Sequence, residues 1–346
     1  MSKVFDLWNE VGEAFGPSGR EDAVREAIAA IAGEYIDDIT TDALGNLICR
    51  KKGSGKKLLF AAHMDSIGVV ATWIDDKGFI RFSQVGGLFK GDLINITVRF
   101  ANGTRGVISY EEKTPFKDLT LDNLFIDIGA KDKADAEQYV QIGDFAVFDV
   151  PRFEQNGVLC GPYLDNRIGC VTLLLMMEQL AETETENDLY FVFTAQEEVG
   201  LRGAGAAAFS VEPDIAIAVD VTDTGDLPER KTPMAVDMGK GPAVKVMDRS
   251  VICTPTVCAA LEQAGQECGI TTQREILPFG GTDTAALQKT RAGVQVGAVS
   301  IPTRYIHSPS EMCAASDVEG AAKLLAKFAA GQNQPGIRFS ICQYCG

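Results

Sequence analysis

The 346-residue chain has only two histidines and two tryptophans, and it has no surplus of basic residues. Its 48 acidic side chains outnumber 32 lysines and arginines, which gives a net charge of −16. Nucleic acid and anionic membrane surfaces are therefore not expected as partners. No apolar run is long enough to span a bilayer, and the first residues hold no apolar signal core, so we expect a cytoplasmic protein without membrane association.

Cysteine is present, but not in the pattern of a disulfide framework. The nine cysteines are an odd number scattered through a long chain, which favours reduced thiols in the cytosol. Cys342 and Cys345 form a lone CxxC near the end of the chain. Without a second pair, this spacing is weak evidence for a metal site, and a solvent-exposed tail is the simpler interpretation.

Segments with strand and helix patterns alternate at both ends of the chain, which predicts an α/β domain with a mainly parallel central sheet and helices on both faces. The middle of the chain instead contains short alternating segments separated by Gly, Asn and Asp, the pattern of a small all-β unit. We therefore expect residues 1–66 and 151–346 to form the α/β domain, with 67–150 as an inserted β-rich domain. The expected strands are 46–50, 57–62, 189–194, 214–219 and 294–299, and the expected helices are 4–15, 21–36, 168–183, 201–209, 255–267 and 316–330.

The two histidines occupy similar positions. His63 ends the apolar strand LLFAAH, and His307 follows the short apolar run Tyr305-Ile306. In open α/β sheets, ligands bind outside the carboxyl ends of the strands, which is where both imidazoles are expected. Either histidine alone would be explained as a hydrogen-bonded core residue.

Carboxylates occur at equivalent points of the chain. Asp165 lies in a loop that opens a helix, Glu197 and Glu198 follow the apolar strand LYFVFTAQ, and Asp220 ends another apolar strand. A carboxylate at such a position is costly unless it meets a cation or strong donors. One of them could be a helix cap, but several together with two histidines predict a metal site.

Two imidazoles and three carboxylates suit zinc, cobalt or manganese better than calcium or magnesium. Five ligands exceed the needs of one tetrahedral zinc ion, and a carboxylate that bridges two ions accounts for the number. Of the adjacent Glu197 and Glu198, one would bind metal while its neighbour acts as a general base. Asp65 is placed to accept the second N–H of His63.

Nine short motifs occur in an order that resembles the M42 family of metallopeptidases, the glutamyl-aminopeptidase-like or tetrahedral aminopeptidases. The resemblance spans about residues 17–312. It implies that His63 and Asp220 hold one metal, that Glu198 and His307 hold the other, and that Asp165 bridges them. It also implies that Glu197 is the catalytic base and Asp65 the partner of His63. The motifs are Ser18-Gly19, Asp42–Asn46, Ala62–Gly68, Leu124–Ala130, Leu164–Gly169, Gln196–Ala204, Ala218–Asp220, Gly280–Asp283 and Tyr305–Glu311.

The resemblance implies an aminopeptidase that removes the N-terminal residue of short peptides with two divalent ions, zinc or cobalt. It also implies that the inserted β unit is a dimerisation domain, and that dimers can assemble into a hollow shell of twelve subunits. The chain departs from the family at Ser66, where Glu is common, and at Lys113–Phe116, where many members carry a histidine shortly after the proline.

Gly281, Thr282 and Asp283 form a turn that we expect to line the substrate cleft, although a plain helix-capping turn explains it equally well.

Three other functions compete with the aminopeptidase. A deacylase of N-acyl amino acids or a carboxypeptidase would use nearly the same ligands. An endoglucanase would need aromatic platforms, which two tryptophans hardly supply, and would have no use for the histidines. A non-catalytic relative would be expected to have lost a ligand, and none is missing.

Overall fold

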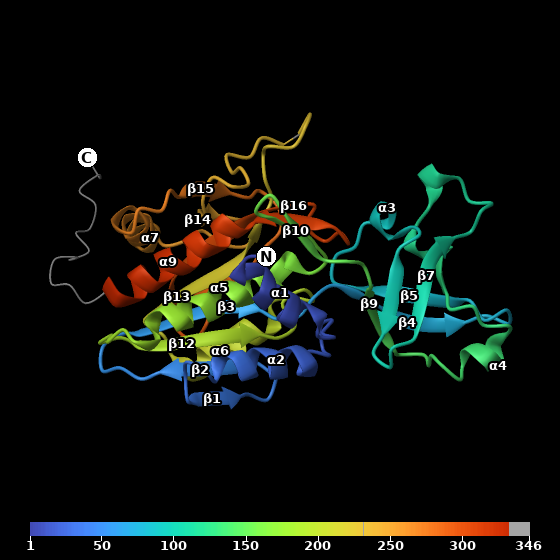
Figure 1. Ribbon diagram of the computed structural model, residues 1–346, viewed down its shortest axis with the longest axis horizontal. Helices are drawn as coiled ribbons and strands as arrows, with labels where there is room; N and C mark the ends of the chain where they lie inside the picture. The colour runs from blue at the N-terminus through green and yellow to red at the C-terminus, as the bar shows by residue number, and fades with distance from the viewer. Residues whose placement is uncertain (231, 332–346) are drawn as a thin grey trace.

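The computed structural model describes residues 1–230 and 232–331, so the predicted Cys342 and Cys345 tail lies outside the described residues. Figure 1 shows two bodies, a larger one built of a sheet with helices and a smaller one made mostly of strands. The strands of the smaller body lie between Gly68 and Phe148, inside the interval 67–150, and those of the larger body lie before and after it.

The larger body is built on a mixed sheet of 11 strands. Its centre is parallel, in the order β12, β3, β13, β16. The flanks are antiparallel, with β2 and β1 beyond β12, and β17, β11 and β10 beyond β16, while β14 pairs with β16 and β15. The bounds are β1 Asp38–Thr41, β2 Leu47–Lys51, β3 Lys57–His63, β10 Phe153–Gln155, β11 Val158–Gly161, β12 Asp188–Thr194, β13 Ile215–Thr222, β14 Ala243–Met247, β15 Gln273–Ile276, β16 Gln295–Arg304 and β17 Glu311–Ala314.

The predicted mainly parallel sheet is therefore correct for the four central strands and for the pair β14 and β15, but not for the flanks. Antiparallel neighbours need only a short connection, and the chain supplies such connections at the flanks. Asn156 and Gly157 join β10 to β11, and both have positive φ, as a two-residue hairpin turn of the primed type requires.

Helices cover both faces of the sheet because successive strand residues point to opposite sides. On β3, Leu58, Phe60 and Ala62 join one buried cluster, and Leu59 and Ala61 join another. The first cluster includes α1 (Lys3–Glu13), α2 (Asp22–Ala32), α5 (Leu164–Ala181), α7 (Pro255–Glu267) and α9 (Ala315–Gly331), and the second includes α6 (Arg202–Val211) and α8 (Thr284–Gln288).

Helix α5 is the central element of the first layer. Fifteen of its 18 residues are buried, because it packs on the sheet and is itself flanked by α1, α2 and α9. A helix that is apolar on all sides is typical of the interior of a large domain. Its first turn carries Asp165, so a deeply buried helix fixes this carboxylate in place.

The smaller body is a closed six-stranded barrel in the order β4, β5, β8, β7, β6, β9. Inward and outward residues alternate, as in β7, and the inner ones form a core of their own. Only four residues separate the end of β3 from the start of β4, so the carboxyl edge of the parallel strands lies beside the barrel. The bounds are β4 Gly68–Ile74, β5 Ile80–Val85, α3 Lys90–Leu93, β6 Thr97–Phe100, β7 Arg105–Tyr110, η1 Phe116–Asp118, η2 Leu121–Asn123, β8 Leu124–Asp127, α4 Lys133–Ala136 and β9 Phe145–Phe148.

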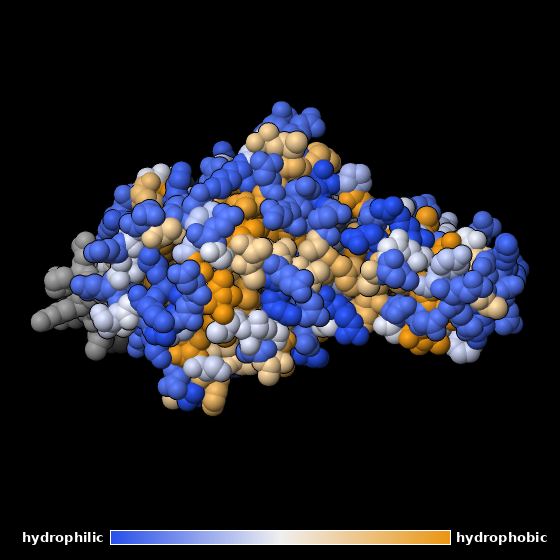
Figure 2. All heavy atoms as spheres, turned by 60° about the horizontal axis from the view of Figure 1, so that its bottom comes forward, coloured by the Kyte–Doolittle hydropathy of each residue, from blue (hydrophilic) through white to orange (hydrophobic). Residues whose placement is uncertain are grey.

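Hydrophilic side chains cover most of the face drawn in Figure 2, with apolar residues gathered towards the middle of the larger body. Among the described residues, no helix combines the length and the apolar character needed to cross a membrane.

Candidate metal centre

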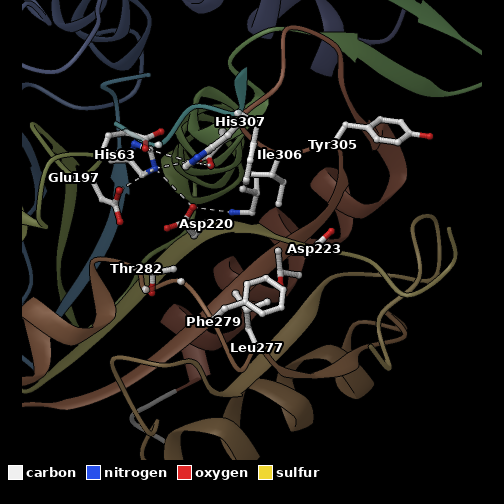
Figure 3. Close-up of a pocket in the computed structure, with 18 of the residues that line it drawn as sticks. His63, Glu197, Asp220, Asp223, Leu277, Phe279, Thr282, Tyr305, Ile306 and His307 are labelled. Atoms are coloured by element: carbon white, nitrogen blue, oxygen red, sulfur yellow. Dashed lines mark hydrogen bonds and ion pairs between the residues drawn. The ribbon is translucent and has the colours of Figure 1, made fainter. Parts of the chain in front are cut away.

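The predicted ligands meet at the carboxyl edge of the parallel strands, as Figure 3 shows for the labelled ones. They arrive from five different segments, and all line one cavity. His63 is the last residue of β3, Asp220 lies in β13, Glu197 and Glu198 follow β12, Asp165 lies in the first turn of α5, and His307 lies between β16 and β17.

The Asp165 carboxylate lies between the two imidazoles. Its Oδ1 is 3.0 Å from Nε2 of His63, and its Oδ2 is 3.2 Å from Nε2 of His307. On the far side, Oε2 of Glu198 lies 3.3 Å from the same nitrogen of His307. A carboxylate with one oxygen towards each histidine has the arrangement of a ligand shared by two cations.

The remaining carboxylates surround His63. Glu197 Oε2 and Asp220 Oδ1 each lie 3.8 Å from its Nε2. The donor atoms form two overlapping groups, and within each group all atoms lie within 4.8 Å of one another. One group is His63 with Glu197 and Asp220, and the other is His63 with Asp165 and Glu198. Glu197 is therefore close enough to be either a ligand or a base beside the ligands.

A buried oxygen supports a cation at this position. Oε1 of Glu198 is shielded from solvent and has no hydrogen-bond partner among the described residues. Leaving a buried carboxylate oxygen unpaired is costly, and a cation removes that cost. The donors are imidazole nitrogens and carboxylate oxygens, so they fit zinc or cobalt.

Burial and the neighbouring charges shift the pKa values of the predicted ligands. Burial raises the pKa of Glu198 to about 8 and that of Asp220 to about 7. Burial alone would lower the pKa of His307, but the charge of Glu198 and the contact with Asp165 raise it to about 10. Burial would raise the pKa of Asp165, but the two histidines lower it below its ordinary value.

Asp65 organises the site in more ways than the sequence predicts. Nδ1 of His63 lies 3.1 Å from the carbonyl oxygen of Asp65 and 3.5 Å from its carboxylate. The carboxylate accepts hydrogen bonds from the backbone N–H of Glu197, at 2.9 Å, and of Glu198, at 3.2 Å. It also accepts the hydroxyl of Ser18 at 2.6 Å. Asp65 therefore holds the glutamate pair and contacts the imidazole.

Sequence reasoning assigned no role in the site to Glu311 or Glu21. The Glu311 carboxylate accepts the backbone N–H of Asp165, at 2.9 Å, and of His307, at 2.8 Å. Glu21 accepts the N–H of Gln196 at 3.1 Å, just before the glutamate pair. The signal for Glu311 was its place four residues after His307, at the start of a strand.

The site opens into a cavity of about 670 Å³. Gly281 and Thr282 line it, as expected for a substrate-binding turn. Asp283 is not among the lining residues. Asp283 is buried directly before α8, and it accepts a hydrogen bond from the hydroxyl of Thr194. The turn therefore has both a lining part and a part that packs inside the protein.

A model of the family described as M42 glutamyl aminopeptidase matches residues 45–324. The chain belongs to this family. The predicted family membership is thus confirmed, and the chain is a peptide hydrolase of the aminopeptidase type.

Relatives of the M42 chain cover nearly its full length. A protein of Acetivibrio thermocellus described as a putative aminopeptidase is 50% identical and covers 93% of this chain and 97% of its own. The lysyl aminopeptidase of Pyrococcus furiosus is 34% identical and covers 92% of this chain and 95% of its own.

Solved structures of similar proteins have the same fold. The aminopeptidase of the archaeon Desulfurococcus kamchatkensis superposes with a TM-score of 0.91 at 34% identity, covering 95% of this chain and 94% of its own. The Pyrococcus horikoshii TET1 peptidase, which can assemble into a tetrahedron or a large octahedral shell, has a TM-score of 0.87 at 32% identity and covers 95% and 100%. A Thermotoga maritima structure described as an endoglucanase has a TM-score of 0.79 at 32% identity. The match covers 95% of this chain and 97% of the Thermotoga chain.

Proposed function

We propose that this M42 chain removes the N-terminal residue of peptides with two divalent ions, zinc or cobalt. The observation that carries the proposal is the Asp165 carboxylate, which turns one oxygen to His63 and the other to His307. Two imidazoles and three carboxylates exceed what one tetrahedral ion needs, and a carboxylate shared by two ions accounts for the number.

Each ion would have two ligands of its own. His63 and Asp220 would hold one, Glu198 and His307 would hold the other, and Asp165 would serve both. When bound, such ions act as Lewis acids and lower the pKa of a coordinated water towards neutrality. Glu311 and Asp65 support this arrangement, because they fix the backbone of three ligand-bearing segments through hydrogen bonds.

Glu197 is proposed as the general base. It is 8% exposed, its backbone N–H is held by Asp65, and its carboxylate lines the cavity 3.8 Å from Nε2 of His63. It would accept a proton from the attacking water and deliver that proton to the leaving amine. The free α-amine of the substrate would lie among the carboxylates of the site, which restricts cleavage to the N-terminus.

Assembly and location are extensions of the same proposal. Residues 67–150 would be a dimerisation domain inserted into the catalytic domain formed by 1–66 and 151–346, and dimers could build a dodecamer. The seven cysteines among the described residues are all free thiols, which supports a cytoplasmic protein.

The test is an assay of aminoacyl-p-nitroanilides before and after chelation, with zinc or cobalt added back and metals per subunit counted. We expect about two ions per chain and activity that follows them. An N-acetylated aminoacyl anilide serves as the matched substrate without a free amine. Release of acetate from the acetylated substrate, without release of p-nitroaniline from the free-amine substrates, would favour a deacylase. Chelator-resistant hydrolysis of glucan would favour a glycosidase.

A further inference from the structure

We propose that the cavity selects peptides with a bulky, uncharged apolar N-terminal residue, and that the Asp223–Arg230 ion pair excludes charged ones. This inference rests on the proposed aminopeptidase function and names its substrate class. It differs from what the relatives' names suggest, because those names refer to lysyl and glutamyl substrates.

The wall of the cavity away from the metal centre is apolar. Figure 3 shows Leu277 and Phe279 across Asp220 from His63, with Ile306 on the opposite side. Leu227 also lines the cavity. Phe279 is 41% exposed, so it offers free apolar area to a ligand. A leucine or methionine side chain entering this space would bury apolar surface against it.

The charges that line the cavity cancel outside the metal centre. Among the described residues lining it, Arg230 is the only lysine or arginine, and Asp223 is the only carboxylate beyond the predicted ligands and Glu197. These two side chains form an ion pair with each other. They remain 17% and 23% exposed, so both stay within reach of the cavity.

The pair lies where a long substrate side chain would end. Asp223 comes three residues after Asp220 and one residue beyond β13, which places it about 10 Å further along the chain. In Figure 3 it lies on the side of Asp220 away from Glu197. A side chain directed away from the metal centre would therefore meet both the apolar wall and the ion pair.

A charged side chain would have to compete for a partner that is already taken. Glutamate would need Arg230, which Asp223 occupies, and lysine would need Asp223, which Arg230 occupies. Burying a charge without a partner is costly, whereas a leucine needs none. The neighbouring Asp226–Arg304 pair, with Oδ2 and Nη2 2.5 Å apart, is likewise mutually satisfied.

The experiment compares kcat/KM for Leu-, Met-, Ala-, Lys- and Glu-p-nitroanilides in the metal-loaded wild type and in two variants. We expect Leu and Met to exceed Lys and Glu by at least about tenfold in the wild type. Asp223→Asn frees Arg230 and should raise the Glu/Leu ratio by about tenfold. Arg230→Gln frees Asp223 and should raise the Lys/Leu ratio by a similar factor.

Arg304→Gln is the matched control, because it breaks the adjacent pair at a residue that does not line the cavity. It should leave both ratios unchanged. A wild type that prefers Lys or Glu, or variants whose ratios follow the control, would overturn the proposal. Inactivity of the metal-loaded wild type on all five substrates would instead reject the aminopeptidase function itself.

Discussion

Replacing Glu197 by glutamine removes a proton acceptor while leaving the shape of the side chain nearly unchanged. The N–H bond to Asp65 comes from the backbone, so it survives the change. General bases contribute about 10²–10⁴ in rate, and we expect kcat to fall by that factor. This corresponds to about 3–5 kcal/mol of transition-state stabilisation.

The same variant decides whether Glu197 is a base or a ligand, because its Oε2 lies only 3.8 Å from Nε2 of His63. A base can be lost without loss of metal, so Glu197→Gln should keep both ions by elemental analysis while kcat falls. Glu198→Gln is the matched control and should lose metal. A Glu197→Gln enzyme that works near the wild-type rate, or whose rate falls only in step with its metal content, would refute the assignment.

Three further outcomes follow from the structure. His307→Ala should reduce metal content to about one ion per chain, counted by elemental analysis; full retention would remove His307 from the ligand set. Metal binding should release protons near pH 7 and strengthen as pH rises, because Glu198 and Asp220 have raised pKa values of about 8 and 7 and must be deprotonated to bind. Calorimetry in two buffers measures that release, and its absence would contradict the pKa directions. Arg167→Met should cost about 2–5 kcal/mol in chemical denaturation, since buried Arg167 donates to the carbonyl oxygens of Val11 and Gly16; a loss under about 0.5 kcal/mol would show that both carbonyls find other donors.

The same pKa values determine whether the protein without metal becomes more or less stable as pH rises. A carboxyl whose pKa is raised by folding is bound to a proton more readily in the folded state. Glu198 and Asp220 therefore reduce stability as pH rises from the ordinary carboxyl range to about 8. Bound metal replaces those protons, so the stabilisation by metal should be largest at the alkaline end of this window.

Local patterns were enough to predict most central elements. The helix expected at 255–267 is α7 with the same bounds, because Pro255 stands in its first turn and apolar residues recur with helical spacing. The strand ends that carry His63 and Asp220 were also recognisable, since a polar residue closes an apolar run. Strand β13 continues two residues beyond Asp220, to Thr222.

Long-range pairing was beyond such patterns. The antiparallel flanks depend on which strands meet in space, and short turns such as Asn156-Gly157 are the local sign of them. Glu311 and Glu21 reach the site across 146 and 175 residues, through hydrogen bonds to backbone N–H groups. No periodicity of the sequence reveals such contacts, because any acceptor of the right length can make them.

The central claim is that Asp165 joins two ions in one site. Crystals of the zinc-loaded protein, measured by anomalous diffraction at the zinc edge, test it directly. The account predicts two peaks, one beside His63 and Asp220 and one beside Glu198 and His307, with the Asp165 carboxylate between them. A single peak in fully loaded crystals, or two peaks of which only one contacts Asp165, would contradict it.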